Sequence, residues 1–396
     1  MRSLTTLPGV ALLAFLAACG PAEPVALGAP LTLDVPAGAV TGPRLSMRPD
    51  GGLVLSWMAT AGDATSLRFA TIEHGELTDS REVTSDPAMF VSWADLPSLL
   101  QIEDDHWVAH WLRYSAAKTY SYDVVVAQSF DDGRSWSEPL AVHTDGTPTE
   151  HGFVSMHRDE DGTALLWLDG RNTPDAPMTL RAAVVTPSGE RVREQLVDAS
   201  VCDCCQTDTA VSSRGPIAVY RDRTEDEIRD IYISRYTDGA WESGTRLYAD
   251  NWNIAGCPVN GPSIVANEDL VAVAWFSAAN DAPVVRVAVS SDGGANFAAP
   301  VTVSTGRLAG YVGLATIDDE TLAVSWVGRD QNGNTLQLRT VSVDGRLGEI
   351  HSVADIAQVR VFPQLGFQDG YLYLFWTDKA GDFSELAGRK IPVETS

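Results

Sequence analysis

Short apolar segments that end in an aromatic residue recur along the chain, as at residues 53–57 and 271–275. Each is preceded by another strand-like segment and a turn, often one rich in Asp or Gly, and most are followed by a third strand-like segment. Alternation with a period of two favours strands, and no stretch has the longer apolar period of a helix. The final aromatic residues lie 50 to 56 residues apart: Trp57, Trp111, Trp167, Tyr220, Trp275, Trp326 and Trp376.

A four-stranded antiparallel unit that repeats at this interval is typical of a β-propeller blade. The sequence therefore predicts an all-β chain, with residues 30–396 as a single propeller domain. Seven blades are favoured, and six blades with an appended sheet are the alternative. The last repeat has strands for only three positions, and a strand-like segment at residues 30–35 precedes the first repeat. We expect this N-terminal strand to complete the seventh blade and close the ring, which removes exposed sheet edges.

The N-terminus carries an apolar run at residues 10–18 that is too short to span a membrane as a helix. The following Leu-Ala-Ala-Cys, residues 16–19, resembles the lipobox of bacterial lipoproteins. This resemblance implies a signal peptide at 1–18, lipidation of Cys19 and a linker at 19–29. An ordinary signal peptide with an incidental cysteine is the alternative. Either reading predicts that the folded part works outside the cytoplasm. With lipidation the protein belongs to the cell envelope, and Gly20 after the cysteine favours the outer membrane by analogy with bacterial sorting.

The charge balance narrows the range of partners. The 396 residues include 53 acidic and 28 basic side chains, giving a formal net charge of -25. Such a chain repels nucleic acid and anionic membrane surfaces. We therefore expect no nucleic-acid partner, and membrane association only through the lipid on Cys19.

Arginines recur just beyond the repeated aromatic residues, in loops that the predicted topology places around the mouth of the ring. A guanidinium group can hold a carboxylate, sulfate or phosphate through two hydrogen bonds, so these residues are candidates for binding an anion. The alternative is that they form ion pairs between blades and lock the ring. The candidates are Arg113, Arg171, Arg221, Arg223 and Arg329.

Four cysteines enter the predicted fourth and fifth blades on this same face: Cys202, Cys204, Cys205 and Cys257. Three arrangements compete. Disulfides suit an extracytoplasmic compartment. Thiolates could instead bind a soft ion such as copper or zinc, although the spacing differs from the usual zinc knuckle. The third arrangement is a redox-active pair beside one structural bridge.

Two predicted turns, residues 129–136 and 290–297, match the Asp-box pattern S-x-D-x-G-x-x-[W/F]. Together with the repeat length and the segment Pro43-Arg44-Leu45-Ser46, they make the chain resemble the sialidase superfamily with its BNR repeats. In that family the Asp-box joins the third and fourth strands of a blade, on the face opposite the active site.

The resemblance implies candidate catalytic residues. Active sialidases use three arginines to hold the substrate carboxylate, a tyrosine nucleophile assisted by a glutamate, and an aspartate as acid and base. By position Arg44 corresponds to the first arginine, although Leu45-Ser46 replaces the family's Ile-Pro. Arg221 and Arg329 are candidates for the other two arginines, Tyr311 for the nucleophile and Glu150 for its partner. Sialidase propellers have six blades and no cysteine-rich rim, so the chain departs from the pattern in both respects.

The leading interpretation is a lipid-anchored propeller that binds an acidic glycan at its mouth. Whether it is an enzyme stays open. As a glycoside hydrolase of the exo-sialidase type it would use Glu150 or Asp222, with a raised pKa, as general acid. The alternative is a non-catalytic accessory protein that uses the cysteines for soft-metal binding or thiol redox. A protein-binding platform is a third reading.

Overall fold

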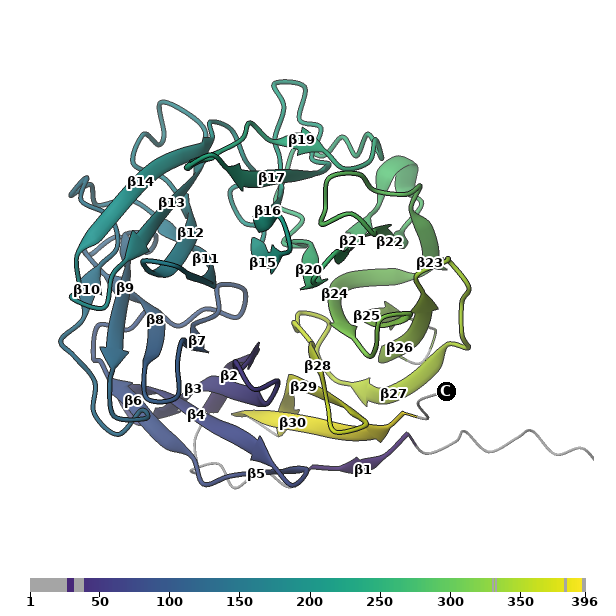
Figure 1. The fold of residues 1–396 in the computed structure, drawn as a ribbon, viewed down its shortest axis with the longest axis horizontal. Helices are drawn as coiled ribbons and strands as arrows, with labels where there is room; N and C mark the ends of the chain where they lie inside the picture. Colours follow the sequence, from purple (N-terminus) through teal and green to yellow (C-terminus); the bar gives the residue numbers. More distant parts are fainter. Residues whose placement is uncertain (1–26, 32–38, 330, 332, 381–382, 394–396) are drawn as a thin grey trace, which may run out of the picture.

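The computed structural model describes residues 27–31, 39–329, 331, 333–380 and 383–393. Seven antiparallel sheets of four or five strands stand around a common axis, each forming one blade of a propeller (Figure 1). The prediction of seven blades is confirmed, and the alternative of six is wrong. No helix in these residues is long and apolar enough to cross a membrane. Cys19 and the predicted signal peptide lie outside the described residues.

Each blade runs outward from an innermost strand beside the axis. The innermost strands are β2 (Ala39–Met47), β7 (Ser98–Gln101), β11 (His151–Asp159), β15 (Asp208–Ser212), β20 (Ser263–Asn267), β24 (Leu308–Thr316) and β28 (Gln364–Gln368). The second strands are β3 (Leu53–Ala61), β8 (Trp107–Tyr114), β12 (Gly162–Asp169), β16 (Gly215–Arg221), β21 (Leu270–Ser277), β25 (Thr321–Arg329) and β29 (Tyr371–Ala380).

The third strands are β4 (Ala64–Glu73), β9 (Tyr122–Ser129), β13 (Thr179–Val185), β17 (Ile231–Thr237), β22 (Val284–Ser290), β26 (Asn334–Ser342) and β30 (Phe383–Pro392). The outer positions hold β5 (Glu76–Leu77), β6 (Arg81–Ser85), β10 (Leu140–Ala141), β14 (Arg191–Asp198), β18 (Ala240–Trp241), β19 (Thr245–Arg246), β23 (Val301–Thr305), β27 (His351–Ile356) and β1 (Ala29–Pro30). One short 3-10 turn, η1 (Ala279–Asp281), lies between β21 and β22. We call the side on which innermost strands begin and second strands end the mouth face.

The ring is closed by the N-terminal strand, as predicted. β1 pairs antiparallel with β30, with Ala29 opposite Lys390 and Pro30 opposite Arg389. Figure 1 shows this purple strand beside the yellow end of the chain. Residues 32–35 of the predicted strand lie outside the described residues.

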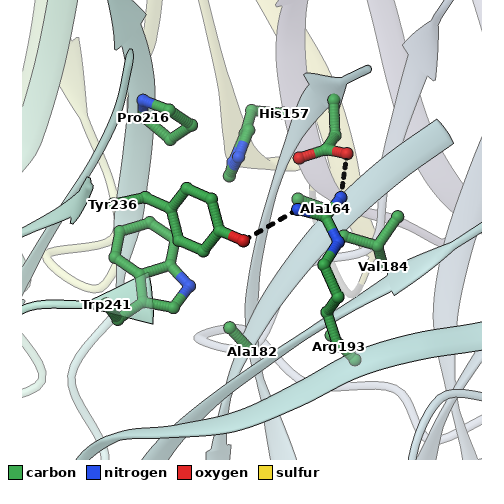
Figure 2. Close-up of a pocket in the computed structure, with 10 residues that line it drawn as sticks. His157, Ala164, Ala182, Val184, Arg193, Pro216, Tyr236 and Trp241 are labelled. Atoms are coloured by element: carbon green, nitrogen blue, oxygen red, sulfur yellow. Dashed lines mark hydrogen bonds and ion pairs between the residues drawn. The ribbon is translucent and has the colours of Figure 1, made fainter. Parts of the chain in front are cut away.

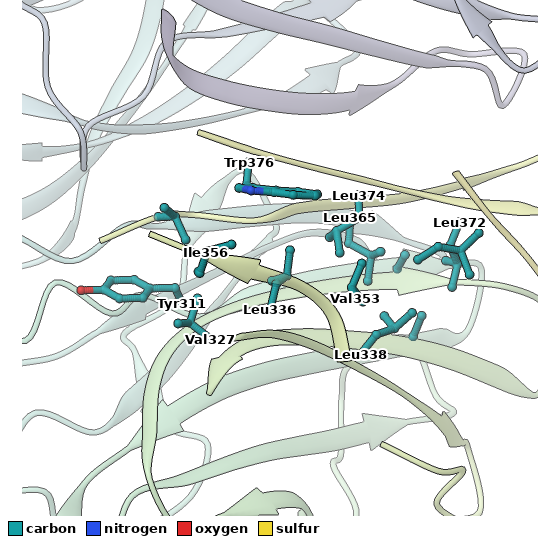
Figure 3. Packing of buried hydrophobic residues seen from close by; sticks show 14 of the residues in the cluster. Tyr311, Val327, Leu336, Leu338, Val353, Ile356, Leu365, Leu372, Leu374 and Trp376 are labelled. Atoms are coloured by element: carbon teal, nitrogen blue, oxygen red, sulfur yellow. The ribbon is translucent and has the colours of Figure 1, made fainter. Parts of the chain in front are cut away.

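The repeated aromatic residues form the core between adjacent blades. Trp111, Trp167, Trp275 and Trp326 are each at most 1% exposed. The cluster between blades 6 and 7 packs side chains from β24 to β30 against one another (Figure 3). The residues that define the repeat are therefore those that join blade to blade.

The turns that match the Asp-box pattern lie where the resemblance implies. They follow β9 and β22, the third strands of blades 2 and 5, on the face opposite the mouth. Asp131 accepts hydrogen bonds from the backbone N–H groups of Arg134 and Ser135 at 3.1 and 2.9 Å. Asp292 accepts one from Asn296 at 2.9 Å. These carboxylates stabilise tight turns and face away from the mouth.

Candidate functional site

Three innermost strands bulge where they begin at the mouth face. The register shifts between Thr41 and Arg44 in β2, between Gly152 and Ser155 in β11, and between Gly310 and Gly313 in β24. Phe153 and Tyr311 sit in the last two bulges with positive φ angles of 54° and 55°. A bulge re-aims side chains that regular pairing would hold in the sheet.

An aromatic cluster, which we call the rim aromatics, consists of Trp93, Tyr311 and Phe362. The rings of Trp93 and Phe362 stack with centroids 5.7 Å apart, and Tyr311 lies edge-on to Phe362 at 5.0 Å. Trp93 is 37% exposed, and the Arg360 guanidinium lies 5.3 Å from the centre of its ring. Figure 3 shows the Tyr311 hydroxyl pointing away from the apolar cluster beside its ring. Loops of blades 2 and 7 and strand β24 of blade 6 thus bring three rings together at the mouth.

A groove of about 950 Å³ runs along the mouth face between blades 5 and 6. Its lining includes Arg286, Arg307, Arg329 and Tyr248. Arg286 is paired with Asp250 at 2.9 Å, whereas Arg307 and Arg329 are exposed. Burial raises the pKa of Tyr311, and the charges of Arg360 and Arg329 oppose that rise. Arg329 therefore links the groove to the rim aromatics.

Two carboxyl groups with raised pKa values meet beside β11 of blade 3: Glu150 precedes this strand, and Asp95 comes from the loop that enters blade 2. The Tyr122 hydroxyl donates a 2.6 Å hydrogen bond to Glu150, and burial raises the pKa of Glu150. Asp95 accepts a 2.8 Å hydrogen bond from the backbone N–H of Phe153, while its other oxygen is buried without a partner. Burial raises the pKa of Asp95 as well, and the charge of Glu150 adds to that effect. A raised pKa favours the protonated form of a carboxyl group, and that form can act as a proton donor.

Glu150 is the only one of the three predicted catalytic residues in this pair. Tyr122 is the tyrosine that hydrogen-bonds Glu150, whereas Tyr311 lies among the rim aromatics. Asp222 lies at the end of blade 4's second strand, where burial and the charge of Asp198 raise its pKa to about 7. The catalytic roles proposed for Tyr311, Glu150 and Asp222 stay predictions, and the structure places the three residues on different blades.

Arg44 is at the centre of the ring rather than at its rim. Its guanidinium lies 3.6 Å from the carboxylate of Asp208, and this ion pair joins the innermost strands of blades 1 and 4. Each side chain is 22% exposed, so the pair remains accessible from the axis.

Two of the recurring arginines form ion pairs with aspartates. Arg113 pairs with Asp86 at 3.2 Å, and Arg171 pairs with Asp169 at 2.7 Å. Each aspartate also accepts the indole N–H of a repeated tryptophan, from Trp111 at 3.1 Å and from Trp167 at 2.8 Å. Asp86 follows the last strand of blade 1, so its pair with Arg113 joins two blades, whereas Asp169 belongs to the same blade as Arg171. Ion pairing within the protein fits both arginines better than anion binding.

Arg221 is 2% exposed, and its N–H groups bind three backbone carbonyl oxygens. These belong to Asn260, Arg229 and Phe276, at 2.9, 2.5 and 2.8 Å. The prediction that Arg221 binds a ligand is wrong in this geometry, because its guanidinium is buried beneath the loops.

Arg223 is also engaged by the protein, although it is less buried. It pairs with Asp203 at 3.0 Å and with Glu227 at 2.6 Å. Of the six arginines predicted to bind a ligand, Arg329 is the one that lines the groove.

The cysteines form a cluster of thiols beside Arg229. The sulfur atoms of Cys202, Cys204 and Cys205 all lie within 4.8 Å of one another. Arg229 approaches the Cys202 sulfur to 3.4 Å. Burial opposes ionisation of Cys202, but hydrogen bonds from the Cys204 and Cys205 thiols outweigh it and lower its pKa. A hydrogen bond from Cys204 likewise lowers the pKa of the exposed Cys257.

The four cysteines are free thiols in this structure. The predicted disulfides are therefore absent from the described residues. The prediction that the two cysteine segments meet is consistent with the hydrogen bond between Cys204 and Cys257.

One further cavity is too small for a ligand. It lies between blades 3 and 4, beside His157, Arg193 and Tyr236, and its volume is about 10 Å³ (Figure 2). Arg193 donates a 2.9 Å hydrogen bond to the Tyr236 hydroxyl and pairs with Asp159. That volume is roughly the space of one water molecule, so this is interior packing.

No protein-family model and no curated protein matches this sequence. Solved structures do match. The α-L-arabinanase of Penicillium chrysogenum, complexed with arabinobiose, is 13% identical with a TM-score of 0.51, covering 93% of this chain and 99% of its own. The GH93 α-L-arabinofuranosidase of Fusarium graminearum, with arabinobiose, is 12% identical with a TM-score of 0.50, covering 92% and 97%. Polysaccharide lyase Uly1 is 10% identical with a TM-score of 0.51, covering 89% and 90%.

At such low identity this likeness concerns the fold alone. The β-propeller fold inferred from the sequence is thereby confirmed.

Proposed function

We propose that the mouth face binds an acidic glycan, with a sugar ring against the rim aromatics and the acid group in the groove. The observation that carries the proposal is the groove itself, where Arg307 and Arg329 are exposed and the charge of Arg329 acts on Tyr311. Among the described residues, no carboxylate lies within ion-pair distance of either arginine. In a chain with a net charge of -25, two such cations form a local site for an anion.

The chemistry of the rim suits a sugar. The exposed face of Trp93 offers an apolar surface with a polar edge, and Arg360 beside it adds a third cation. Guanidinium groups bind a carboxylate through paired hydrogen bonds. The solved neighbours named above are glycan enzymes, two of them with bound arabinobiose, which supports carbohydrate as the ligand class.

We expect sialyllactose to bind and lactose to bind at least 10-fold more weakly, because a charge-assisted hydrogen bond contributes about 1.5–3 kcal/mol. Arg307→Ala with Arg329→Ala should remove this preference, and Trp93→Ala should weaken both sugars. Isothermal titration with sialyllactose, lactose and arabinobiose measures each effect. Arg134→Ala is the matched control, because that side chain is 73% exposed on the opposite face. Equal affinity of the double variant and the wild type for sialyllactose would refute the proposal.

We also propose that the protein hydrolyses the bound glycan, as a glycoside hydrolase of the exo-sialidase type. Glu150 and Asp95 supply two carboxyl groups with raised pKa values, and the Tyr122 hydroxyl orients Glu150. Glu150→Gln keeps this hydrogen bond but removes the proton donor. Release of sugar from sialyllactose by the wild type and its loss in Glu150→Gln would support the role.

The proposed setting is the cell envelope, with the chain anchored in the outer membrane by lipid on Cys19. Fractionation of cells that express the wild type and Cys19→Ser tests the anchor. A soluble Cys19→Ser protein beside a membrane-bound wild type is the expected result, and identical fractionation would contradict it.

A second candidate function rests on the cysteine cluster. Three sulfurs within 4.8 Å of one another, one of them 3.4 Å from a guanidinium, suit a soft ion or thiol exchange. Copper(I) or zinc would be held by Cys202, Cys204 and Cys205, with Cys257 nearby, in an accessory protein that performs no hydrolysis.

We expect the reduced protein to bind one copper(I) ion, and Cys204→Ser to weaken that binding at least 10-fold. Cys204 hydrogen-bonds with both Cys202 and Cys257 and so connects the set. Competition with a chelator measures the affinity, and a thiol titration before and after loading counts the sulfurs engaged. Copper bound equally well by Cys204→Ser would exclude the cluster as its site.

A further inference from the structure

One of the rim aromatics, Tyr311, depends on an unusual backbone conformation. Tyr311 lies at the bulge of β24 with a φ angle of 55°, in the left-handed region that residues with a side chain seldom adopt. For a bulky residue this conformation is strained, and it persists only where neighbouring groups hold the backbone. The rim aromatics therefore depend on whatever holds residue 311 in this conformation.

The side chain of Asn260 holds this backbone. Asn260 lies in the loop that enters blade 5 and is 4% exposed. Its Oδ1 accepts a 2.7 Å hydrogen bond from the backbone N–H of Tyr311. Because this hydrogen bond is buried, water cannot take the place of Asn260 if its side chain is lost.

The amide of Asn260 is itself fixed by hydrogen bonds. Its Nδ2 donates to the backbone carbonyl oxygens of Pro258 and Ala309, at 3.0 and 3.3 Å. The backbone carbonyl of Asn260 accepts a 2.9 Å hydrogen bond from the buried Arg221. The amide nitrogen thus faces two acceptors and the amide oxygen faces a donor, so these bonds orient the side chain toward Tyr311.

Gly310 leaves the space that this contact requires. Its φ angle is 88°, and a Cβ atom at this position would lie 2.2 Å from Asn260 Oδ1 and 2.7 Å from the ring of Phe276. Both distances are too short for a real Cβ atom. A residue with a side chain at position 310 would push Asn260 away from the next N–H group, so glycine is part of the same arrangement.

The same arrangement occurs a second time in the ring. Asp95 Oδ1 accepts a 2.8 Å hydrogen bond from the backbone N–H of Phe153, whose φ angle is 54°. A Cβ atom on the preceding Gly152 would lie 2.0 Å from Asp95 Oδ2. In both cases the side chain that accepts the bond comes from the loop that enters the preceding blade. The shared element is an oxygen atom, which either an amide or a carboxyl group can supply.

The two aromatic residues held in this way differ in their surroundings. Phe153 packs in the apolar core of blades 3 and 4. The ring of Tyr311 instead lies edge-on to Phe362, with centroids 5.0 Å apart, and edge-on to Trp93 at 6.3 Å. A return of residue 311 to the ordinary extended conformation would redirect its Cβ atom and move the ring away from both neighbours.

We propose that Asn260 is a positioning residue for the rim aromatics, which holds Tyr311 in the conformation that supports Trp93 and Phe362. This inference rests on the proposed glycan site. Asn260 is buried beneath the rim, so it acts on a bound sugar through Tyr311 and not by direct contact. Its loss should weaken the contact with the sugar ring and leave the preference for an acid group, which depends on the groove, unchanged.

Isothermal titration of Asn260→Leu and Asn260→Asp tests this role. Leucine has a similar size but accepts no hydrogen bond. We therefore expect sialyllactose and lactose each to bind about 10-fold more weakly, as after the loss of one aromatic contact, with the ratio of the two affinities unchanged. Aspartate keeps the oxygen, as Asp95 does in the other arrangement, and should retain most of the wild-type affinity. Thermal melting verifies that both variants fold.

The Tyr311→Ala background separates positioning from general damage to the fold. If Asn260 acts through Tyr311, then adding Asn260→Leu to Tyr311→Ala should cost no further affinity, whereas independent effects would add. Asn267→Leu is the matched control. Asn267 is exposed at the far end of the innermost strand of the same blade, where it donates a 2.9 Å hydrogen bond to Asp319. This control should bind both sugars as the wild type does.

Hydrogen exchange of the Tyr311 amide reports on the contact without any sugar. In protein labelled with nitrogen-15 tyrosine, the signal that disappears in Tyr311→Phe belongs to this amide. We expect slow exchange in the wild type and in Asn260→Asp, and exchange at least about 10-fold faster in Asn260→Leu.

Three results would overturn the positioning role of Asn260. These are a Tyr311 amide that exchanges equally in Asn260→Leu and the wild type, a full further loss of affinity in the Tyr311→Ala background, and an Asn260→Asp protein that binds as weakly as Asn260→Leu. If the leucine variant does not fold, rapid exchange of this amide in the wild type would overturn it as well. A wild type that binds neither sugar would contradict the proposed glycan site, and the exchange measurement would still decide whether Asn260 holds Tyr311.

Discussion

Replacing Arg221 with methionine should destabilise the protein by about 3–5 kcal/mol, the cost of leaving the partners of a buried charged group unsatisfied. Its guanidinium binds carbonyl oxygens of Asn260, Arg229 and Phe276, which belong to blades 4 and 5 and their connections. Methionine fills a similar volume but donates no hydrogen bond. It also removes the cation stacked on Trp252 at 4.8 Å.

Urea unfolding of Arg221→Met and wild type measures this difference. Arg223→Met is the control, because that arginine is 28% exposed in its side chain and its ion pairs face solvent. Exposed pairs contribute about 0–1 kcal/mol. If the two variants lost equal stability, the inner arginine would have no special structural role, and its exclusion from the ligand site would lose its basis.

The fold could be predicted from the sequence because the aromatic residues that mark the repeat are also the residues buried in the core between blades. Trp111, Trp167 and Trp275 mark the second strands, and burial between blades requires an aromatic residue at that place. Closure was predictable from a count of strands, since the seventh blade lacked one. These features depend on periodicity, which is visible in a single sequence.

The roles of the arginines depend on contacts that periodicity does not reveal. Arg113 pairs with Asp86, which follows the last strand of the preceding blade, whereas Arg171 pairs with Asp169 of its own blade; each aspartate also accepts an indole N–H. An acidic partner several strands away cannot be assigned from spacing alone. The recurrence therefore located the arginines in the loops at the mouth, but the sequence could not assign their separate roles.

The tyrosine partner of Glu150 was missed for a similar reason. Residue 150 forms a parallel bridge with Tyr122, which begins a strand in the preceding blade. Blade-to-blade contacts of this kind bring together residues from separate repeats. The loop at residues 93–95 was the available signal for Asp95, since it enters the second blade at the mouth.

The stability of the folded protein should fall as pH rises from about 4 to about 7. Burial raises the pKa values of Asp95, Glu150, Asp208 and Asp222, the last to about 7. In the unfolded chain these groups ionise near pH 4. Between these values the folded state binds more protons than the unfolded state, so the free energy of unfolding decreases with pH.

Below pH 4 the sign reverses. Burial opposes ionisation of Asp169, but its hydrogen bonds with Arg171 outweigh that effect and lower its pKa, so its contribution is lost in acid. Hydrogen bonds from Thr147 lower the pKa of Asp145 against burial in the same way. We therefore expect maximum stability near pH 4–5.

Asp222→Asn tests the origin of this slope. Asparagine cannot ionise, so the variant should match the wild type at pH 4 and exceed its unfolding midpoint at pH 8 by about 2 °C or more. Melting curves of both proteins at half-unit steps between pH 4 and pH 8 measure the difference. The control is Asp226→Asn, an exposed carboxylate four residues along the same loop, which should follow the wild type throughout. A midpoint gap of equal size at pH 4 and pH 8 would mean that Asp222 affects packing and not proton binding.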